Sequence, residues 1–447
     1  MEMEATDLEL GTLYQNYFTV ARYWTFFLFP VILWAGWDVV LCKNSHHSRE
    51  NGIECIISRS TIRRSFLGAP LLIEFLLNMS TNHRTLHTAE EAVTPFYVGV
   101  DVGGTSVKIG LVDDFGNPVD TGDVDSEGAH RSVIAIKTEP RPQIAVELMA
   151  EATMALLQRL QIDKSLCRGI GLGVPTTMDK STRKLRRPPN LPTWADFPLC
   201  DELAKQIDMP VLFCNDANAA AYGEYWIGSA SGQSSLALLT LGTGIGAGII
   251  IEGKSLDGDI GYGGECGHII IDSAEDALLC GCGHRGHLEA YCSATGVARR
   301  TVNMTMHRES SIRPKITPET RLADIPKIVY LEAEGGDPLA LEIISDTAKY
   351  LAIGIVSLLH TIDVACVLLG GAMTFGGKQS SLGQRFLAQI TQDVKSKAFP
   401  AIAENVQIDF AVLGADAGYI GAAGLVREYV KRAQSHEGGF SYATKGR

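Results

Sequence analysis

The chain has few cysteines, few basic residues and no short repeat, and each of these shortages argues against a class of proteins. Only ten cysteines occur in 447 residues, which is too sparse for a disulfide scaffold. Positive charge is also scarce, because 39 Lys and Arg stand against 51 Asp and Glu, a net charge of −12. A nucleic-acid binder depends on clustered basic residues, so this balance argues against one. No tandem repeat of fixed short period is visible. The length and the hydrophobic content of 46% favour roughly two to three domains with a large core.

The first 93 residues differ in composition from the rest. Residues 17–42 are strongly apolar and aromatic, and residues 66–79 form a second apolar stretch. Residues 24–42 approach the length of a membrane span, although Pro30 and Asp38 interrupt them. A signal peptide fits poorly, because the residues before the apolar run are acidic where basic ones are expected. Three interpretations stay open: a membrane anchor, a partly ordered extension, and an over-long gene model whose real start is Met79, which we favour.

From residue 94 onward, strand and helix patterns interleave. Apolar runs predict buried strands at residues 169–174, 210–213 and 364–369, and helical spacing predicts helices at 144–160 and 417–433. Two strand–glycine–strand units, at residues 96–112 and 235–251, indicate a duplicated α/β fold facing a shared cleft. We expect a smaller α/β domain at residues 94–217, a larger one at 218–433 and a polar tail at 434–447. The stretch 175–198 is predicted to be a long functional loop.

The first glycine unit carries the chemistry of a phosphate site. Its leading strand ends at a lone carboxylate, Asp101, which is followed by Gly103, Gly104 and Thr105. Adjacent glycines let the backbone turn tightly and bring its N–H groups close to a bulky anion. The acid can hold a divalent cation, so the unit suits Mg-nucleotide binding. It is neither a Walker A loop nor a dinucleotide fingerprint, which need a Gly-Lys-Ser/Thr end and a following helix respectively. An ordinary hairpin with a stray acid is the alternative.

The second glycine unit repeats these features about 140 residues later. Alternate glycines with a threonine again offer backbone donors to phosphate, so two such turns in a duplicated fold favour a nucleotide clamp over two ordinary hairpins. The residues of this turn are Gly242, Thr243, Gly244 and Gly246.

An acidic residue follows the strand predicted at 210–213. Residues 214–220 read Cys-Asn-Asp-Ala-Asn-Ala-Ala and open a predicted helix. Because Asn and Asp are favoured helix N-caps, a capping role for Asp216 stays open. A carboxylate at a strand end that faces the cleft is also where a general base for a substrate hydroxyl would lie.

A third group combines thiols and imidazoles. Two cysteines stand at C-x-C spacing, with glycines that let the backbone bend and histidines on either side. This pattern predicts a tetrahedral zinc site. Four protein ligands would close the coordination shell, so the metal would be structural. His284 and Cys292 are spare ligands, and reduced thiols that cluster by chance are the alternative. The predicted ligand set is His268, Cys280, Cys282 and His287.

Taken together and in this order, the motifs resemble those of the ROK family (repressors, open reading frames and kinases), over about residues 94–433. The matching motifs are D-x-G-G-T at 101–105, G-x-P at 173–175, N-L-x-x-W at 190–194, N-D-A-N-A-A at 215–220, L-G-T-G-I-G-x-G at 241–248, E-x-G-H at 265–268 and C-x-C-G-x-x-G-x-x-E at 280–289. The resemblance implies the duplicated ribonuclease-H-like fold of sugar kinases, actin and Hsp70, with two domains around a cleft. The first 93 residues have no counterpart in it.

Within the family the resemblance is strongest to the bacterial ATP-dependent glucokinases. It implies transfer of the ATP γ-phosphate to the 6-hydroxyl of D-glucose, with Asp216 as the general base. One ring nitrogen of His268 would bind zinc and the other the sugar. The residues expected to bind sugar hydroxyls are Asn190, Asn215, Glu265, His268 and Glu289. Those expected to hold MgATP are Asp101, Gly103, Gly104, Thr105, Gly242, Thr243, Gly244, Gly246, Gly370 and Gly371.

Two residues depart from the family pattern. The usual third zinc cysteine is His287 here, and Thr176 stands where the family often has a glycine after G-x-P. The second change leaves open a kinase for N-acetylmannosamine, N-acetylglucosamine or fructose, and a polyphosphate donor also stays open. A sugar-responsive repressor is the remaining alternative, but residues 1–93 carry 7 Lys and Arg against 10 Asp and Glu, which does not suit DNA. We expect a cytoplasmic enzyme, a homodimer by analogy, and membrane contact only if residues 17–42 belong to the protein.

Overall fold

The computed structural model describes residues 34–35, 38–39, 42–44, 53–55, 86–121, 133–188 and 190–435. The chain divides into two compact units, Met1–His83 and Arg84–Arg447. In the first unit, β1 (Trp34–Ala35) pairs antiparallel with β2 (Asp38–Val39), and β3 (Cys42–Asn44) with β4 (Ile53–Cys55). The predicted start at Met79 and most of the apolar segment 17–42 lie outside the described residues. Among the described residues, none of the helices combines the length and hydrophobicity that crossing a bilayer requires.

The first large sheet of the second unit has the strand order β11-β10-β6-β7-β9. Strands β6 (Phe96–Val102) and β7 (Ser106–Val112) form the predicted antiparallel hairpin. Strand β10 (Cys167–Val174) runs parallel to β6, and β11 (Val211–Asn215) runs parallel to β10. Strand β9 (Val133–Lys137) pairs antiparallel with β7. The carboxyl ends of β6, β10 and β11 therefore meet at one edge of the sheet.

The second large sheet repeats this plan with the order β14-β13-β12-β15-β16. Strands β12 (Ser235–Leu241) and β13 (Ile245–Ile251) form the second predicted hairpin, and β14 (Lys254–Ser255) extends it. Strands β15 (Cys366–Gly370) and β16 (Gln407–Phe410) continue the sheet in parallel on the other side of β12. A hairpin followed by two parallel strands thus occurs twice, which confirms the predicted duplicated α/β fold. A small parallel pair joins β5 (His87–Thr88) to β8 (Val119–Asp120).

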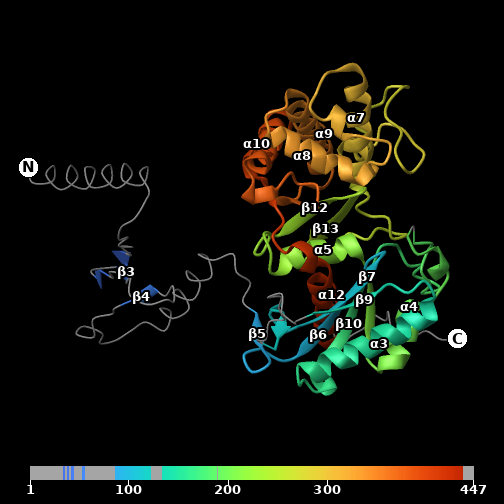
Figure 1. Ribbon diagram of the computed structural model, residues 1–447. Coiled ribbons are helices and arrows are strands. Elements are labelled where there is room, and N and C mark those ends of the chain that lie inside the picture. The colour runs from blue at the N-terminus through green and yellow to red at the C-terminus, as the bar shows by residue number, and fades with distance from the viewer. Residues whose placement is uncertain are drawn as a thin grey trace, which may run out of the picture. The chain divides into compact units, whose positions relative to one another are not determined.

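Helices cover both faces of each sheet. One face of the first sheet packs on α3 and α4, around buried residues such as Val98, Leu172 and Met149. One face of the second sheet packs against the helical layer that includes α7 to α10, around Leu239, Val367 and other buried side chains (Figure 1). The helices are α3 (Pro142–Arg159), α4 (Leu199–Ile207), α5 (Asp216–Trp226), α6 (Leu288–Cys292), α7 (Ala294–His307), α8 (Ile325–Glu334), α9 (Pro338–Ile362), α10 (Ser381–Lys397), α11 (Pro400–Asn405) and α12 (Ala417–Ser435).

Two helices, α5 and α12, lie between the two sheets (Figure 1). They pack on each other, while α5 also contacts β12 and β13, and α12 contacts β6 and β10. The contact of α12 with the first sheet is close enough to require glycine. A Cβ at Gly99 would overlap the carbonyl of Tyr419, and one at Gly171 would overlap that of Ala422. The closing helix therefore completes the first sheet although it follows the second in sequence. The domain division at residues 217 and 218 stays a prediction.

Residues 175–188 and 190–198 are mostly loop, as predicted, and hydrogen bonds hold this loop in a defined shape, while its functional role stays a prediction. Met178 and Leu185 pair as an isolated antiparallel bridge, and a single turn of 3₁₀ helix spans Pro192–Trp194. At the tip, Arg183 has a left-handed φ of +56°, and its side chain donates to Asp201 of α4 at 2.6 Å. Side-chain and backbone hydrogen bonds thus give this segment a fixed shape, which sequence patterns alone do not reveal.

Candidate active site

Two carboxylates converge where the first sheet meets the interior helices. Asp101 occupies the penultimate position of β6, next to Gly173 of β10 in the sheet register. Asp216 is the first residue of α5, directly after β11. A Cβ on Gly173 would lie 3.9 Å from the Cα of Asp216, so the three strand ends share one corner. The convergence follows from the parallel arrangement of β6, β10 and β11.

The helix that begins at Asp216 is capped by its neighbour. The Asn215 side chain accepts from the backbone N–H groups of Ala217 at 3.0 Å and Asn218 at 3.3 Å, which is N-cap geometry. Asp216 also accepts from the N–H of Ala217 at 2.9 Å, through one oxygen. Because Asn215 supplies the cap, the second oxygen of Asp216 is not required by the helix.

The surroundings favour the protonated form of both acids. Burial, and after it the charge of Asp216, raise the pKa of Asp101 to about 6, while Lys108 acts in the opposite direction. Burial also raises the pKa of Asp216, although its backbone hydrogen bonds partly offset the effect. The influence of the Asp216 charge on Asp101 is consistent with their convergence. Elevated pKa values at a shared corner are typical of sites that bind cations or move protons.

The second glycine turn lies against the same helix. A Cβ on Gly246 would be 3.6 Å from the Cβ of Ala217, the residue after Asp216. Gly371 follows β15 and approaches the backbone of Leu241, where β12 ends, and Met373 N donates to the Leu241 carbonyl at 3.0 Å. The residues predicted to hold phosphate at 242–246 and the pair predicted near the nucleoside at 370–371 are therefore neighbours.

The first glycine turn is fixed from two sides. Gly103 N donates to the carbonyl of Ser106 at 2.9 Å within the hairpin, and the hydroxyl of Thr138 donates to the Gly103 carbonyl at 2.7 Å. Gly104 and Thr105 are exposed. The side chain of Asn190 lies over Gly104, where a Cβ would be 3.3 Å from the Asn190 Cβ. The structure thus brings a predicted sugar ligand to the edge of the first turn.

The remaining predicted sugar ligands differ in how many hydrogen bonds they already make to other protein groups. Glu265 is half exposed, and its Oε2 lies 4.0 Å from Nε2 of His268. The Asn215 amide donates to the carbonyl of Thr176 at 3.3 Å in addition to capping α5. Both oxygens of Glu289 have protein partners, namely the N–H of Ile245 at 2.9 Å and Sγ of Cys280 at 3.3 Å. Glu265 and His268 therefore have the most freedom to meet a ligand.

The four predicted metal ligands come together in one cluster. Their ligand atoms all lie within 4.8 Å of one another. Nδ1 of His287 is 3.2 Å from Nδ1 of His268 and 3.2 Å from Sγ of Cys282, and Sγ of Cys280 is 3.8 Å from Nδ1 of His268. Zinc bonds of ordinary length place tetrahedral N and S ligands about 3.3–3.8 Å apart. The donor set and its spacing fit a zinc ion.

The orientation of His268 agrees with a double role. Its Nδ1 faces the thiols, while its Nε2 is the atom nearest to Glu265. Of the spare ligands, Cys292 is fully buried and its thiol lies 3.5 Å from the carbonyl of Thr347, and His284 is exposed with its ring centroid 6.1 Å from that of His287. Neither belongs to the cluster.

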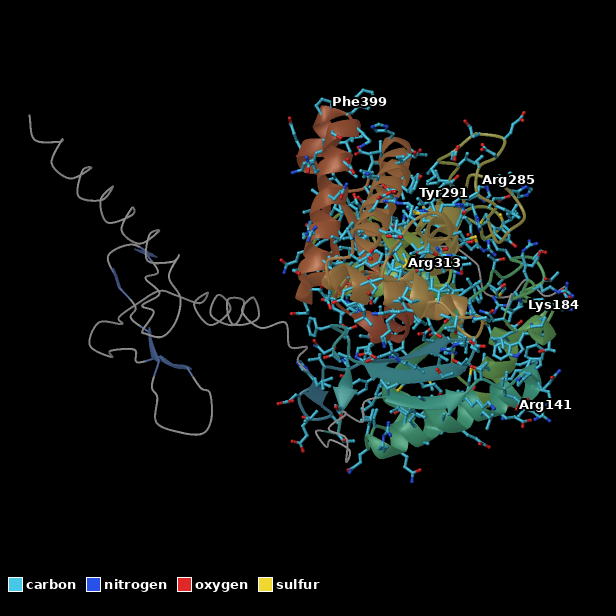
Figure 2. All side chains as sticks on the ribbon, turned by 45° about the horizontal axis from the view of Figure 1, so that its top comes forward. Arg141, Lys184, Arg285, Tyr291, Arg313 and Phe399 are labelled. Atoms are coloured by element: carbon cyan, nitrogen blue, oxygen red, sulfur yellow. The ribbon has the colours of Figure 1, made fainter. Side chains whose placement is uncertain are left out.

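Side chains outside the cluster, among them Tyr291 and Arg285, which are labelled in Figure 2, hold its loop in place. The Tyr291 hydroxyl donates to Asp272 at 2.6 Å and accepts from the N–H of Leu278 at 3.0 Å. The Arg285 guanidinium donates to the carbonyl of Ala277 at 2.8 Å. Because these bonds brace residues 272–285 from both ends, the ligands are positioned by the fold.

Sequence reasoning missed several residues that shape the site. Lys108 faces Asp101 across the β6–β7 hairpin, and its Nζ donates to the carbonyl of Ala415 at 2.9 Å. Asn218, buried in α5, donates to Asp257 at 2.9 Å and so ties the helix of Asp216 to the loop that leads to Glu265. The Asn-Asp-Ala-Asn pattern was a signal for Asn218, whereas Lys108 and Thr138 had none.

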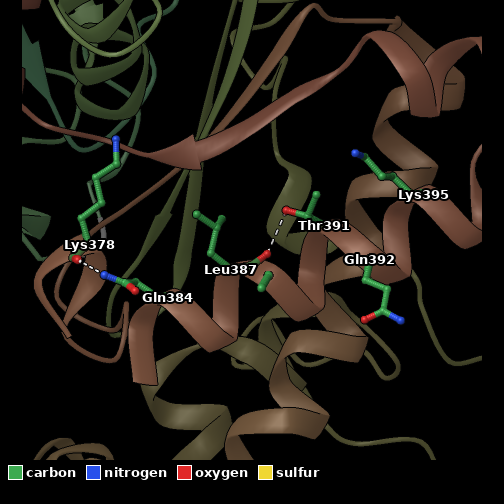
Figure 3. A pocket seen from close by; sticks show the side chains of 7 residues that line it. Lys378, Gln384, Leu387, Thr391, Gln392 and Lys395 are labelled. Carbon is green, nitrogen blue, oxygen red and sulfur yellow. Dashed lines mark hydrogen bonds between the residues drawn. The ribbon is translucent and has the colours of Figure 1, made fainter. Parts of the chain in front are cut away.

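A groove elsewhere in the second unit contains none of the predicted site residues (Figure 3). It follows an outer face of α10, where the Thr391 hydroxyl donates to the carbonyl of Leu387 and the Gln384 amide donates to that of Lys378, at 2.8 and 2.9 Å. Because the groove contains none of the predicted site residues, we assign it no part in the chemistry of the site. The lining residues are Lys378, Gln384, Leu387, Ala388, Thr391, Gln392 and Lys395.

Comparison with known proteins gives a consistent result. The model of the ROK family matches residues 97–429. A glucokinase of Halalkalibacterium halodurans is 35% identical over 334 residues, which are 74% of this chain and 95% of that protein. A ROK family glucokinase from Streptomyces griseus, solved with glucose and AMPPNP, is 29% identical with a TM-score of 0.56, covering 74% of this chain and 99% of that one. A ROK hexokinase from Thermus thermophilus is 27% identical with a TM-score of 0.60, covering 76% and 99%.

Proposed function

Since this chain belongs to the ROK family, we propose that it is an ATP-dependent hexose kinase that phosphorylates the 6-hydroxyl of D-glucose. One observation carries the proposal: Asp216 lies at the same corner as Asp101, between the two glycine turns. A carboxylate that can act as a base, beside a second acid for the cation and two sets of backbone donors, is the arrangement that phosphoryl transfer to an alcohol requires. The similarity to glucokinases over most of the chain supports glucose as the acceptor.

Asp216 is the general base of the proposed reaction. An alcohol becomes a good nucleophile when a positioned carboxylate accepts its proton as the bond to phosphorus forms. Burial raises the pKa of Asp216, which makes its carboxylate a stronger base than that of an ordinary aspartate. Transfer is direct and in line, so the protein contributes position and charge with no covalent intermediate.

The two glycine turns bind the phosphates of ATP. Their backbone N–H groups suit phosphate oxygens, and Gly370 with Gly371 lies beside the second turn, where the nucleoside would continue. Asp101, with Thr105 close by, would hold the Mg²⁺ that accompanies ATP and neutralises its charge. The residues so assigned are Asp101, Gly103, Gly104, Thr105, Gly242, Thr243, Gly244, Gly246, Gly370 and Gly371.

Sugar hydroxyls would be recognised by side chains from both halves of the fold. Asn215 ends β11 of the first sheet, Asn190 lies in the loop between β10 and α4, and Glu265, His268 and Glu289 come from the segment around the metal cluster. The zinc bound by His268, Cys280, Cys282 and His287 would be structural, because four protein ligands fill its shell. It would fix the ring of His268 so that Nε2 faces the sugar. With these substrates we place the enzyme in the cytoplasm.

Steady-state kinetics on a sugar panel tests the proposal. The purified full chain is assayed with MgATP and glucose, N-acetylmannosamine, N-acetylglucosamine or fructose in a coupled ADP assay, and bound metal is quantified in the same sample. We expect the highest kcat/KM with glucose and about one zinc per chain. The absence of sugar-dependent ATP turnover with every sugar would refute the kinase assignment.

One residue, Thr176, favours a different sugar as the acceptor of the phosphoryl group. Thr176 replaces the family's usual glycine, and its carbonyl accepts from Asn215 while its hydroxyl donates to the carbonyl of Arg186 at 3.2 Å. A side chain at this position fixes the loop next to Asn215 and can change which group at C2 of the sugar is accepted. If N-acetylmannosamine, N-acetylglucosamine or fructose gives the highest kcat/KM, the enzyme is a kinase for that sugar with the same chemistry.

A further inference from the structure

The second glycine turn is held by the segment that follows the metal cluster. The Ala294 N–H donates to the carbonyl of Gly242 at 2.8 Å, and the Thr295 hydroxyl donates to the carbonyl of Thr243 at 2.8 Å. The N–H of Ile245 donates to Oε2 of Glu289 at 2.9 Å. Three successive parts of the turn are thus bonded to the eight-residue stretch 288–295, which contains α6 and the start of α7.

These bonds determine where the free donors of the turn point. In a trans peptide the N–H and the C=O lie on opposite sides. Because the carbonyls of Gly242 and Thr243 face α7, the N–H groups of Thr243 and Gly244 point away from it. These two amides belong to residues that we assign to phosphate. Their direction therefore depends on the bonds to 288–295.

Glu289 also links this turn to the metal cluster. Its Oε1 is 3.3 Å from Sγ of Cys280, and its Oε2 accepts from Ile245. The carboxylate lies directly against the turn, since a Cβ on Gly244 would collide with Oε2. Glu289 also follows the ligand His287 by only two residues. A single side chain thus contacts a metal ligand and the phosphate turn.

We propose that Glu289 is a positioning residue for the nucleotide, which fixes the second glycine turn and makes the affinity for ATP depend on the metal cluster. This inference rests on the proposed function, because it takes the turn as the phosphate site. It assigns the metal an influence on both substrates, through His268 toward the sugar and through Glu289 toward ATP.

Direct binding of Mg-AMPPNP without sugar tests the inference. Isothermal titration gives the dissociation constant for the full chain and for E289A, E289Q, T295V and T301V. T301V is the matched control, since the Thr301 hydroxyl in the same helix bonds only within it, to the carbonyl of Val297 at 2.7 Å. Glucose affinity and melting temperature are measured alongside for every variant.

We expect E289A to raise the dissociation constant for AMPPNP about tenfold, or about 1.4 kcal/mol, because a charge-assisted bond to the turn is lost. E289Q keeps a carbonyl oxygen for Ile245 and should stay within about twofold of the wild type. T295V should weaken AMPPNP about threefold and T301V should have no effect. If E289A weakens only glucose, or E289Q is as weak as E289A, the inference is wrong.

A second arm addresses the metal itself. The protein is stripped with a chelator, and AMPPNP binding is measured before and after one equivalent of Zn²⁺ is restored. We expect the stripped protein to bind AMPPNP several-fold more weakly and the restored protein to recover. Equal affinity in both forms would overturn the link. Turnover of the wild-type enzyme with glucose is recorded separately, so failure of the kinase assignment is distinguishable from failure of this inference.

Discussion

Replacing Asp216 with asparagine removes a base with almost no change in shape. Asparagine keeps an oxygen that can accept from the N–H of Ala217, as Asp216 does at 2.9 Å. The helix retains its cap, because the cap is the side chain of Asn215. We therefore expect the variant to fold and to bind glucose as the wild type does, so that any loss of turnover reports the missing proton acceptor.

The size of the loss follows from the role. General bases contribute about 10²- to 10⁴-fold to the rate, which corresponds to about 3–5.5 kcal/mol of barrier. A second change is independent of turnover. The charge of Asp216 contributes to the elevated pKa of Asp101, about 6, so the neutral asparagine should lower the pKa of Asp101 toward the ordinary value for aspartate. The loss of turnover and the lower pKa of Asp101 both follow from the loss of the Asp216 carboxylate, and each is measured by its own assay.

Three measurements decide the matter. The kcat for glucose is taken from a coupled assay, the glucose dissociation constant from titration, and the pKa of Asp101 from the pH dependence of Mg-AMPPNP binding. D163N is the control, since Asp163 caps a short turn by accepting from the N–H of Ser165 at 2.8 Å and lies outside the site. A D216N enzyme with kcat within about tenfold of the wild type would refute Asp216 as the base.

Three further outcomes are expected. In initial-rate measurements, kcat/KM for MgATP should fall as the pH decreases through about 6, the pKa of Asp101. A profile that stays flat down to about pH 5 would contradict this. Asp101 has a higher pKa in the folded state than in the unfolded state. Its contribution to stability is therefore fully present when the pH is below the unfolded-state pKa, and it is lost as the pH rises through the folded-state pKa. D101N should therefore raise the free energy of unfolding at neutral pH by up to about 3 kcal/mol in urea titrations, and a decrease would be contrary evidence. C282S should lose its zinc by elemental analysis, and retention of stoichiometric zinc would exclude Cys282 as a ligand.

The sequence allowed prediction of those parts of the site that local spacing determines. Both glycine hairpins and the helix beginning at Asp216 depend on residues a few positions apart, and the His and Cys cluster depends on residues at most 19 positions apart, so the sequence predicts all of them. Strand limits were less accurate: the strand predicted at 364–369 spans Cys366–Gly370.

Contacts between distant residues could not be predicted in this way. The bond between Ile245 and Glu289 joins residues 44 positions apart, and the one between Asn218 and Asp257 joins residues 39 apart. Lys108 faces Asp101 only because of the hairpin register. A single sequence carries no local pattern for such pairs, since they depend on how whole elements pack.

The position of helix α12 has a consequence for biosynthesis. The apolar surface of β6 and β10 that receives Tyr419 and Ala422 is made early, whereas Ala417–Ser435 leaves the ribosome some 240 residues after β10. During translation that surface stays exposed or is shielded by a chaperone, and the nascent N-terminal half cannot reach its final packing alone. Deletion of α12 would therefore deprive the first sheet of its cover and produce aggregation, although Asp101 and Asp216 would both be retained.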